Sequence, residues 1–402
     1  MIPRPDRQSR HPATPWRKGN ALPSVYEFFA GGGMARAGLG AGWTCLFAND
    51  FDPKKGQAYR ANWGTGGELA VGDVREVEAA ALPGHADLVW GSFPCQDLSL
   101  AGARAGLGGA RSGTFFPFWR LIDALAADGR APALVAVENV CGALTARGGA
   151  DFGVICRTFA EAGYRFGPLV INADLFVPQS RPRLFVIGVR RDIEIAPRLL
   201  TGAPVAPFHT RALGHAVDRL PSPTRERLLW WNLPAPKPRT TTFADLIEAE
   251  PADVSWHTQA ETKRLLDLMS PVNLAKVEAA KHAGRRMIGG VYRRTRRDGA
   301  GGKTQRAEVR FDDVAGCLRT PGGGSSRQII MIVEGYRVRS RLISARETAR
   351  LMGLDDSFVL PGNYNAAYHL TGDGVVAPVV RHLARHIFEP VLGQPSAGLR
   401  AA

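Results

Sequence analysis

Short apolar runs recur along residues 25–95 at a nearly constant pitch, and each ends in small, polar or reactive residues. The run ends at Phe29, Asp50, Asp73 and Cys95 are 21, 23 and 22 residues apart. One strand and one helix fill such an interval, and strands alternating with helices predict a parallel sheet covered by helices on both faces. Because ligands of such sheets bind at the carboxyl ends of the strands, we expect these four run ends to share one ligand-binding edge.

The strand–helix pattern continues to about residue 190 and then gives way to a stretch rich in Pro, Trp and Arg, before regular signal returns near Arg337. We therefore predict an α/β fold with a Rossmann-like mixed, mostly parallel sheet, helices on both faces, and a smaller, irregular second domain. The predicted divisions are a disordered basic arm (1–20), the first domain (21–190), the second domain (191–335), a return of the chain that completes the first domain (336–390) and a tail (391–402).

The positive charge of the chain is concentrated in two segments. Residues 1–20 and 285–310 together carry +11 of the formal net charge of +14. A fold does not need such blocks, whereas a polyanion such as a nucleic acid would attract them; a solvated basic loop is the alternative.

The five cysteines include no pair separated by two residues, which argues against a disulfide framework or a zinc site and indicates a reducing cytoplasm. We expect no metal, and we expect the four cysteines other than Cys95 to be core or near-core residues. No apolar run reaches the ~18 residues of a membrane span, so we expect no membrane partner.

A glycine turn, Phe29-Ala30-Gly31-Gly32-Gly33, follows the first predicted strand. Glycines let the backbone approach a ligand closely, and Asp50 and Asp73 at the next strand ends can accept hydrogen bonds from a ribose and an adenine amino group. Together they predict an adenosine-containing cofactor. The alternatives are a structural turn with two capping acids, or a nicotinamide or flavin enzyme, although Arg36 stands where a dinucleotide motif has its third glycine.

Reactive side chains stand at two strand ends and just before the last strand of the first domain. Cys95 follows Pro94 beside the expected cofactor edge, although a lone cysteine is more often a small buried residue. Glu138 ends another strand, where a carboxyl group can donate to a heteroatom or cap the next helix. Arg181 and Arg183 flank a proline and can hold a substrate oxygen or phosphate, or belong to a surface loop.

In their order and spacing these motifs resemble those of the DNA cytosine-5 methyltransferase family, over residues 25–190 and 337–385. The matching segments are Phe29-x-Gly31-x-Gly33, Asp50, Asp73, Pro94-Cys95-Gln96, Glu138-Asn139-Val140, Gln179-x-Arg181-x-Arg183, Arg341 through Gly353, and Gly372-Asp373-Gly374-Val375. The chain departs from the family in having Asp373 where Asn is usual, Leu354-Asp355 where Phe-Pro is usual, and no Gln near Met352.

The resemblance implies a sequence-specific DNA methyltransferase that transfers a methyl group from S-adenosylmethionine to carbon 5 of a flipped cytosine through a covalent Cys95 adduct. Glu138, Arg181 and Arg183 would complete the catalytic set. The cofactor contacts it implies are Phe29, Gly31, Gly33, Asp50, Asp73, Pro94, Asp373 and Val375.

The implied partner is double-stranded DNA, in the cytoplasm and associated with the nucleoid, and residues 191–335 become the target-recognition domain. The expected DNA contacts are Gln96, Arg104, Arg111, Tyr292, Arg293, Arg294, Arg296, Arg297, Arg319 and Arg327. The enzyme would belong to a restriction–modification system with a cognate endonuclease or act as an orphan methylase. A tRNA cytosine methyltransferase would need a smaller second domain, and a catalytically silent DNA-binding regulator would not need Cys95, Glu138 and Arg183.

Overall fold

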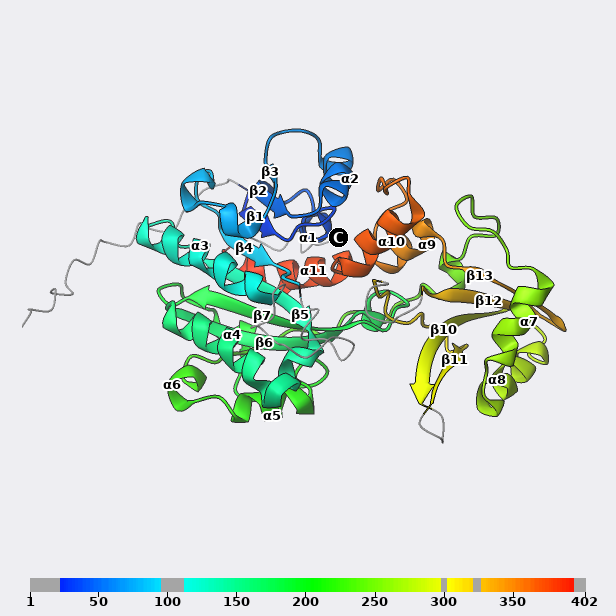
Figure 1. Ribbon diagram of the computed structural model, residues 1–402. Helices are drawn as coiled ribbons and strands as arrows, with labels where there is room; N and C mark the ends of the chain where they lie inside the picture. The colour runs from blue at the N-terminus through cyan, green and yellow to red at the C-terminus, as the bar shows by residue number, and fades with distance from the viewer. Residues whose placement is uncertain (1–21, 95–111, 298–301, 321–326, 394–402) are drawn as a thin grey trace, which may run out of the picture.

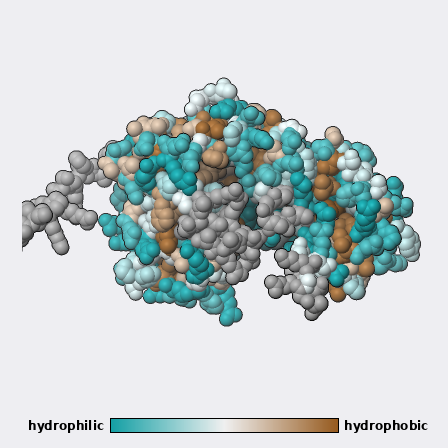
Figure 2. All heavy atoms as spheres, in the orientation of Figure 1, coloured by the Kyte–Doolittle hydropathy of each residue, from teal (hydrophilic) through white to brown (hydrophobic). Residues whose placement is uncertain are grey.

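A computed structural model describes residues 22–94, 112–297, 302–320 and 327–393. The expected basic arm and the tail from residue 394 lie outside the described residues. The chain forms two lobes, the larger built on a seven-stranded sheet and the smaller on a four-stranded sheet (Figure 1). The surface is notched between the lobes (Figure 2).

The seven-stranded sheet has the order β3-β2-β1-β4-β5-β7-β6. Strands β1 to β5 pair in parallel, and β7 runs antiparallel between β5 and β6. This arrangement confirms the predicted fold class and brings the carboxyl ends of β1 to β5 to one edge. The strands are β1 (Ser24–Phe28), β2 (Thr44–Asp50), β3 (Leu69–Val71), β4 (Leu88–Gly91), β5 (Leu134–Val140), β6 (Tyr164–Asn172) and β7 (Pro182–Arg190).

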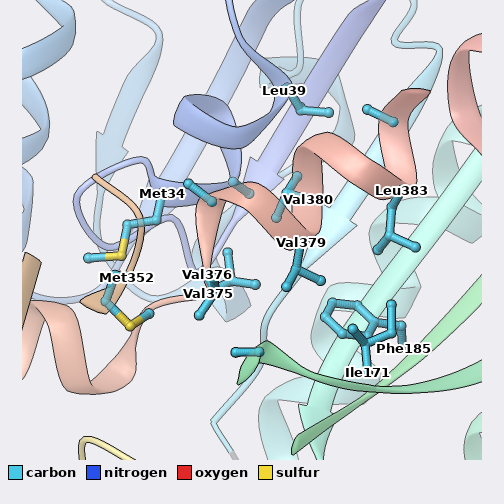
Figure 3. Packing of buried hydrophobic residues seen from close by; sticks show 14 of the residues in the cluster. Met34, Leu39, Ile171, Phe185, Met352, Val375, Val376, Val379, Val380 and Leu383 are labelled. Atoms are coloured by element: carbon cyan, nitrogen blue, oxygen red, sulfur yellow. The ribbon is translucent and has the colours of Figure 1, made fainter. Parts of the chain in front are cut away.

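Helices cover both faces of this sheet, as predicted. One face packs against α1 (Met34–Leu39), α2 (Pro53–Trp63) and α11 (Ala377–Leu383), and the other against α3 (Phe115–Ala127), α4 (Ala150–Glu161) and α5 (Arg211–Asp218). Figure 3 shows α11 between α1 and the sheet, with Val380 toward Leu39 and Val379 toward Phe185. The chain that returns after the second lobe therefore completes the first core.

Strand β6 is an element that the sequence did not predict. Gly167 and Pro168 interrupt its apolar run, and proline has no N–H group that could donate a hydrogen bond to a neighbouring strand. It is tolerated because β6 is the edge strand. Gly167 is required by packing, since a Cβ there would lie 2.4 Å from Trp231 Nε1.

The second lobe comprises two helices and a four-stranded antiparallel sheet in the order β11-β10-β12-β13. Its core lies between this sheet and the helices and includes Leu265, Val277, Val291 and Met331. The lobe is more regular than predicted, because arginines in three of its strands obscure the apolar alternation and the fourth is a short, continuous apolar run. Its elements are α7 (Gln259–Asp267), α8 (Pro271–Lys281), β10 (Met287–Arg297), β11 (Lys303–Arg310), β12 (Ile329–Glu334) and β13 (Arg337–Leu342).

The division of the cores differs from the expected 191–335 boundaries. Residue 335 lies in the turn between β12 and β13, inside the second-lobe sheet. Helix α5 packs in the core of the first lobe, and β9 lies beside β6. The other elements of this stretch are β8 (Leu200–Thr201), α6 (Ser222–Arg225) and β9 (Trp230–Trp231).

The chain returns to the first lobe through α9 (Ala345–Leu351), α10 (Tyr364–Asp373), α11 and α12 (Glu389–Val391). Ser344 and Glu347 form a capping box at the start of α9. The same glutamate pairs with Arg341, and both side chains are fully buried. Within the described part of the chain, every helix is too short or too polar to span a lipid bilayer.

Candidate active site

The glycine turn after β1 has the backbone conformation that its sequence favours. Gly31 and Gly33 have φ angles of 58° and 79°, which glycine adopts without strain, and Phe29 also has a positive φ of 58°. The Gly31 N–H donates to Asp50 Oδ2 at 2.7 Å. A Cβ on Gly31 would meet no heavy atom of the described residues within 4 Å, so these residues leave the space above Gly31 open.

Two acidic residues and one aromatic residue surround this turn. Asp50 also accepts a hydrogen bond from the Asp52 N–H at 2.9 Å, and its burial raises the pKa of the carboxyl group. Asp73 accepts from the Arg75 N–H, which caps the 3-10 helix Val74–Glu76. Phe51, which sequence analysis missed, is 74% exposed directly after Asp50. The sequence signal that could have identified Phe51 is its aromatic side chain directly after Asp50, at the predicted ligand-binding edge.

Glu27 is a second residue that sequence analysis missed. Its Oε1 accepts from the N–H groups of Ala35 and Arg36 at 3.1 and 3.4 Å, which attaches the start of α1 to β1. Its Oε2 is buried and has no hydrogen-bond partner among the described residues. Burial raises the pKa of Glu27 to about 8, against the opposing effect of these hydrogen bonds.

Glu138 and Arg183 meet at the ends of the neighbouring strands β5 and β7. Arg183 Nε lies 3.0 Å from Glu138 Oε1, and both side chains are mostly buried. Asn139 donates to the Phe93 carbonyl at 3.4 Å, which holds the segment before Pro94 against β5. The predicted acid, one predicted arginine and Pro94 therefore share the sheet edge with the glycine turn. Cys95, Gln96, Arg104 and Arg111 lie outside the described residues.

Arg181 is 2% exposed and contacts backbone rather than open space. Its guanidinium donates to the carbonyls of Leu318, Gly372 and Gly374 at 3.0, 2.9 and 2.7 Å. Arg181 thus joins the start of β7 to the segment after β11 and to the end of α10. Val375, an expected cofactor contact, is buried in the core near Met34 and Met352 (Figure 3).

Cys317 is a further thiol at this site. Its Sγ lies 3.4 Å from Arg181 Nη1 and 4.0 Å from Arg183 Nη2. Burial opposes ionisation, but the guanidinium groups of Arg181, Arg183 and Arg319 together hold the thiol pKa below its usual value. The sequence predicted only a core or near-core position for Cys317 and not this contact, because Arg181 and Arg183 are more than 130 residues away in the sequence.

Asp373, the residue that departs from the family pattern, is paired with a lysine. Lys55 Nζ lies 2.7 Å from Asp373 Oδ2, and the Thr320 hydroxyl donates to Asp373 Oδ1. Burial would raise the pKa of Asp373, but Lys55 and Thr320 outweigh it and lower the pKa. No motif indicated Lys55.

The arginines expected to contact DNA point in different directions. Successive residues of a strand alternate between faces, so Arg293 shares the face of buried Val291, which packs on α7 and α8, and Arg294 lies on the opposite face. Arg294 is exposed, lies 3.6 Å from Glu308 and sits over the Tyr292 ring. For Arg296 and Arg297 only the backbone, within β10, is described.

The remaining expected DNA contacts lie at the junction of the lobes. A Cβ on Gly316 would overlap the Tyr292 hydroxyl, so this tyrosine packs on the backbone before Cys317. Burial raises the pKa of Tyr292 to about 12. Arg327 lies over the Tyr364 ring and donates to Asn365, both on α10, whereas Arg319 is exposed.

Known proteins match most of the length of this chain. A family model described as C-5 cytosine-specific DNA methylase matches residues 24–389. The type II methyltransferase M.NlaX of Neisseria lactamica is 26% identical over 367 residues, covering 90% of this chain and 95% of that protein. M.HhaI of Haemophilus parahaemolyticus is also 26% identical, over 366 residues, covering 90% and 93%.

Solved structures share the fold. The methyltransferase EhMeth of Entamoeba histolytica has a TM-score of 0.60 at 14% identity, covering 92% of this chain and 99% of that chain. The Dnmt2 methyltransferase of S. pombe has a TM-score of 0.56 at 16% identity, covering 92% and 98%.

Proposed function

Because the chain belongs to the C-5 cytosine-specific DNA methylase family and is a DNA cytosine-5 methyltransferase, we propose that it uses S-adenosylmethionine to methylate a cytosine extruded from duplex DNA, with Cys95 as the transient nucleophile. The observation that carries this proposal is the Glu138–Arg183 pair, which lies beside Pro94 at the sheet edge that also holds the glycine turn. Cys95 is bonded directly to Pro94.

The residues around the glycine turn fit S-adenosylmethionine. Open space above Gly31 gives room for a ligand close to the backbone. Asp50 would accept hydrogen bonds from the ribose through lone pairs that Gly31 and Asp52 leave free, Asp73 would accept from the adenine amino group, and the exposed ring of Phe51 would stack on adenine. When bound, the sulfonium group supplies an electrophilic methyl group.

Carbon 5 of cytosine is a weak nucleophile, and the proposed chemistry activates it through carbon 6. The Cys95 thiolate forms a bond to carbon 6, while Glu138, oriented by Arg183, hydrogen-bonds ring nitrogen 3 and the exocyclic amine. The electron pair of the double bond moves to carbon 5, which takes the methyl group. The proton on carbon 5 then leaves to a base, the double bond re-forms and the thiolate is expelled.

The extrusion of the base costs a few kcal/mol, which contacts to phosphate can offset. The basic strands β10 and β11 would supply these contacts from the second lobe. Relatives that match 90% of the chain are called type II methyltransferases, which favours a restriction–modification role with a cognate endonuclease for this chain.

Cys95→Ser tests the nucleophile. We expect the variant to retain affinity for S-adenosylhomocysteine and to lose tritium transfer from labelled S-adenosylmethionine to duplex DNA. Cys141→Ser is the matched control, because burial raises the pKa of the Cys141 thiol to about 11 and leaves it protonated at neutral pH. Transfer by Cys95→Ser at a substantial fraction of the unmodified rate would refute the assignment.

The substrate is tested by parallel assays with duplex DNA and tRNA, followed by bisulfite sequencing of DNA from cells that express the chain. We expect methylation of duplex DNA at one recurring sequence. Methylation of tRNA alone would overturn the proposed substrate.

A further inference from the structure

The Lys55–Asp373 ion pair connects two elements that flank the glycine turn. Lys55 lies one turn into α2, the helix that follows Asp50, and Asp373 is the last residue of α10. Their charged atoms are 2.7 Å apart. Burial would lower the pKa of Lys55, but the carboxylates of Asp373 and Asp50 outweigh it and raise the pKa, so Lys55 lies within electrostatic reach of both acids.

Helix α2, which carries Lys55, is attached to the glycine turn. Asp50 is hydrogen-bonded to the Gly31 N–H, and the Trp63 indole at the end of α2 donates to the Gly32 carbonyl at 2.9 Å. Helix α2 is therefore fixed to the turn at both of its ends. Lys55, between these two attachments, projects its ammonium group across to α10.

The charges of the pair complement each other and remain partly accessible. The side chains of Lys55 and Asp373 are 18% and 43% exposed. A partly exposed ion pair contributes little to folding stability, so its members can exchange partners at a low cost in free energy. A ligand that carries both a carboxylate and an ammonium group could satisfy both residues together.

The pair includes position 373, where the chain departs from the family pattern. An acid at position 373, where the family usually has Asn, would by itself repel an anionic ligand group. Lys55 neutralises that charge and adds a donor for a carboxylate. Position 373 thus has an acid that can accept from an ammonium group, and α2 supplies the matching cation.

Resting on the S-adenosylmethionine use proposed above, we propose that Lys55 and Asp373 bind the zwitterionic amino-acid end of the methyl donor. Lys55 contacts the α-carboxylate and Asp373 contacts the α-ammonium group. Lys55 is thereby a cofactor-binding residue, and its substitution changes affinity only for ligands that carry the amino acid.

Isothermal titration calorimetry with three ligands tests this role without requiring activity. The ligands are S-adenosylhomocysteine, its decarboxylated analogue, and 5′-methylthioadenosine, which lacks the amino acid. We expect Lys55→Met to weaken S-adenosylhomocysteine binding roughly 10- to 100-fold, the range for loss of a hydrogen bond to a charged group, and to leave the other two affinities unchanged. Lys54→Met, at the exposed neighbouring residue, is the control and should change none of them.

The second member of the pair is tested in the same way. Asp373→Asn should weaken S-adenosylhomocysteine but not its deaminated analogue. The proposal would be overturned if Lys55→Met lost equal affinity for S-adenosylhomocysteine and 5′-methylthioadenosine, or lost affinity for neither. If an equal loss of affinity came with a lower Tm, the pair would be a structural link between α2 and α10. Absence of S-adenosylhomocysteine binding by the unmodified chain would instead refute the proposed cofactor.

Discussion

At the scale of single residues, Glu27 is a carboxyl group that burial keeps protonated at neutral pH. It is 2% exposed, and its Oε1 accepts two backbone N–H groups from the first turn of α1. Its pKa is about 8 in the folded chain, compared with an ordinary value of 4.5. Folding therefore takes up a proton between these two pH values, and the stability that Glu27 contributes is present below about pH 4.5 and is lost as the pH rises to about 8.

Glu27→Gln tests this linkage. Glutamine keeps the oxygen that accepts from Ala35 and Arg36 but cannot ionise, so the Tm of the variant minus that of the unmodified chain should increase between about pH 4.5 and about pH 8 and stay constant above that range. Differential scanning calorimetry in buffers of equal ionic strength measures the difference. Glu161→Gln, at an exposed position at the end of α4, should show a constant difference. A Glu27→Gln difference that stays constant or decreases would contradict the account.

At the scale of elements, the turn between β1 and α1 determines how closely a ligand can approach the sheet edge. Gly33 has a φ of 79°, and a Cβ there would lie 2.2 Å from Trp63 Nε1. That same nitrogen donates to the Gly32 carbonyl. A side chain at position 33 would therefore strain the turn and displace the indole that fixes α2.

Gly33→Ala should lower the free energy of unfolding by roughly 1–3 kcal/mol, the cost of a left-handed conformation for a residue with a Cβ, and should weaken S-adenosylhomocysteine binding. Urea denaturation and calorimetry measure the two effects. Gly42→Ala is the control, because a Cβ there meets no heavy atom within 4 Å and its φ is not in the left-handed region. Equal stability of the two variants would show that the turn does not need glycine at position 33.

The elements also show how far the sequence could predict the site. The ends of β1 to β5 were predictable because the spacing of the apolar runs and the residues at their ends are local signals. Glu138 and Arg183 were predictable because each belongs to a motif with fixed residue types. Lys55 and Cys317 were not predictable, since their partners lie 318 and 136 residues away. The strands β10, β11 and β13 were missed because their arginines, and the two glycines of β10, hide the alternation that would mark a half-buried strand. Strand β12 is a continuous apolar run, which periodicity alone does not assign to a strand.

At the scale of the whole molecule, the two lobes have different proposed roles. The first lobe contains the residues proposed to bind the cofactor and to act in catalysis, and the second lobe presents a basic sheet. The Tyr292 hydroxyl packs on Gly316, next to Cys317, which contacts the arginines of the site. Arg294 lies on the same face of β10 as Tyr292, whereas Arg293 lies on the face covered by α7 and α8. This geometry makes the two neighbouring arginines a matched pair for testing which face meets DNA.

Arg294→Ala should weaken binding to duplex DNA and reduce the slope of log K against log salt by about 1, the value for one lost phosphate contact. Arg293→Ala should leave the slope unchanged. Fluorescence anisotropy with a labelled duplex over a range of salt concentrations measures both slopes. A larger change for Arg293→Ala would show that DNA lies on the other face of the sheet.

The central claim is that Cys95, and not the second thiol at Cys317, attacks the extruded cytosine. A duplex carrying 5-fluorocytosine at the site found by bisulfite sequencing tests it. Ordinary cytosine loses the hydrogen on carbon 5 as a proton before the thiolate is expelled, but fluorine cannot be removed from carbon 5 in this way. The bond between carbon 6 and sulfur therefore persists. After reaction with S-adenosylmethionine and digestion with trypsin, mass spectrometry should find the methylated fluorocytosine adduct on residues 76–104, which contain Cys95. An adduct on residues 311–319, which contain Cys317, or the absence of any adduct while methyl transfer to unmodified DNA proceeds, would contradict the account.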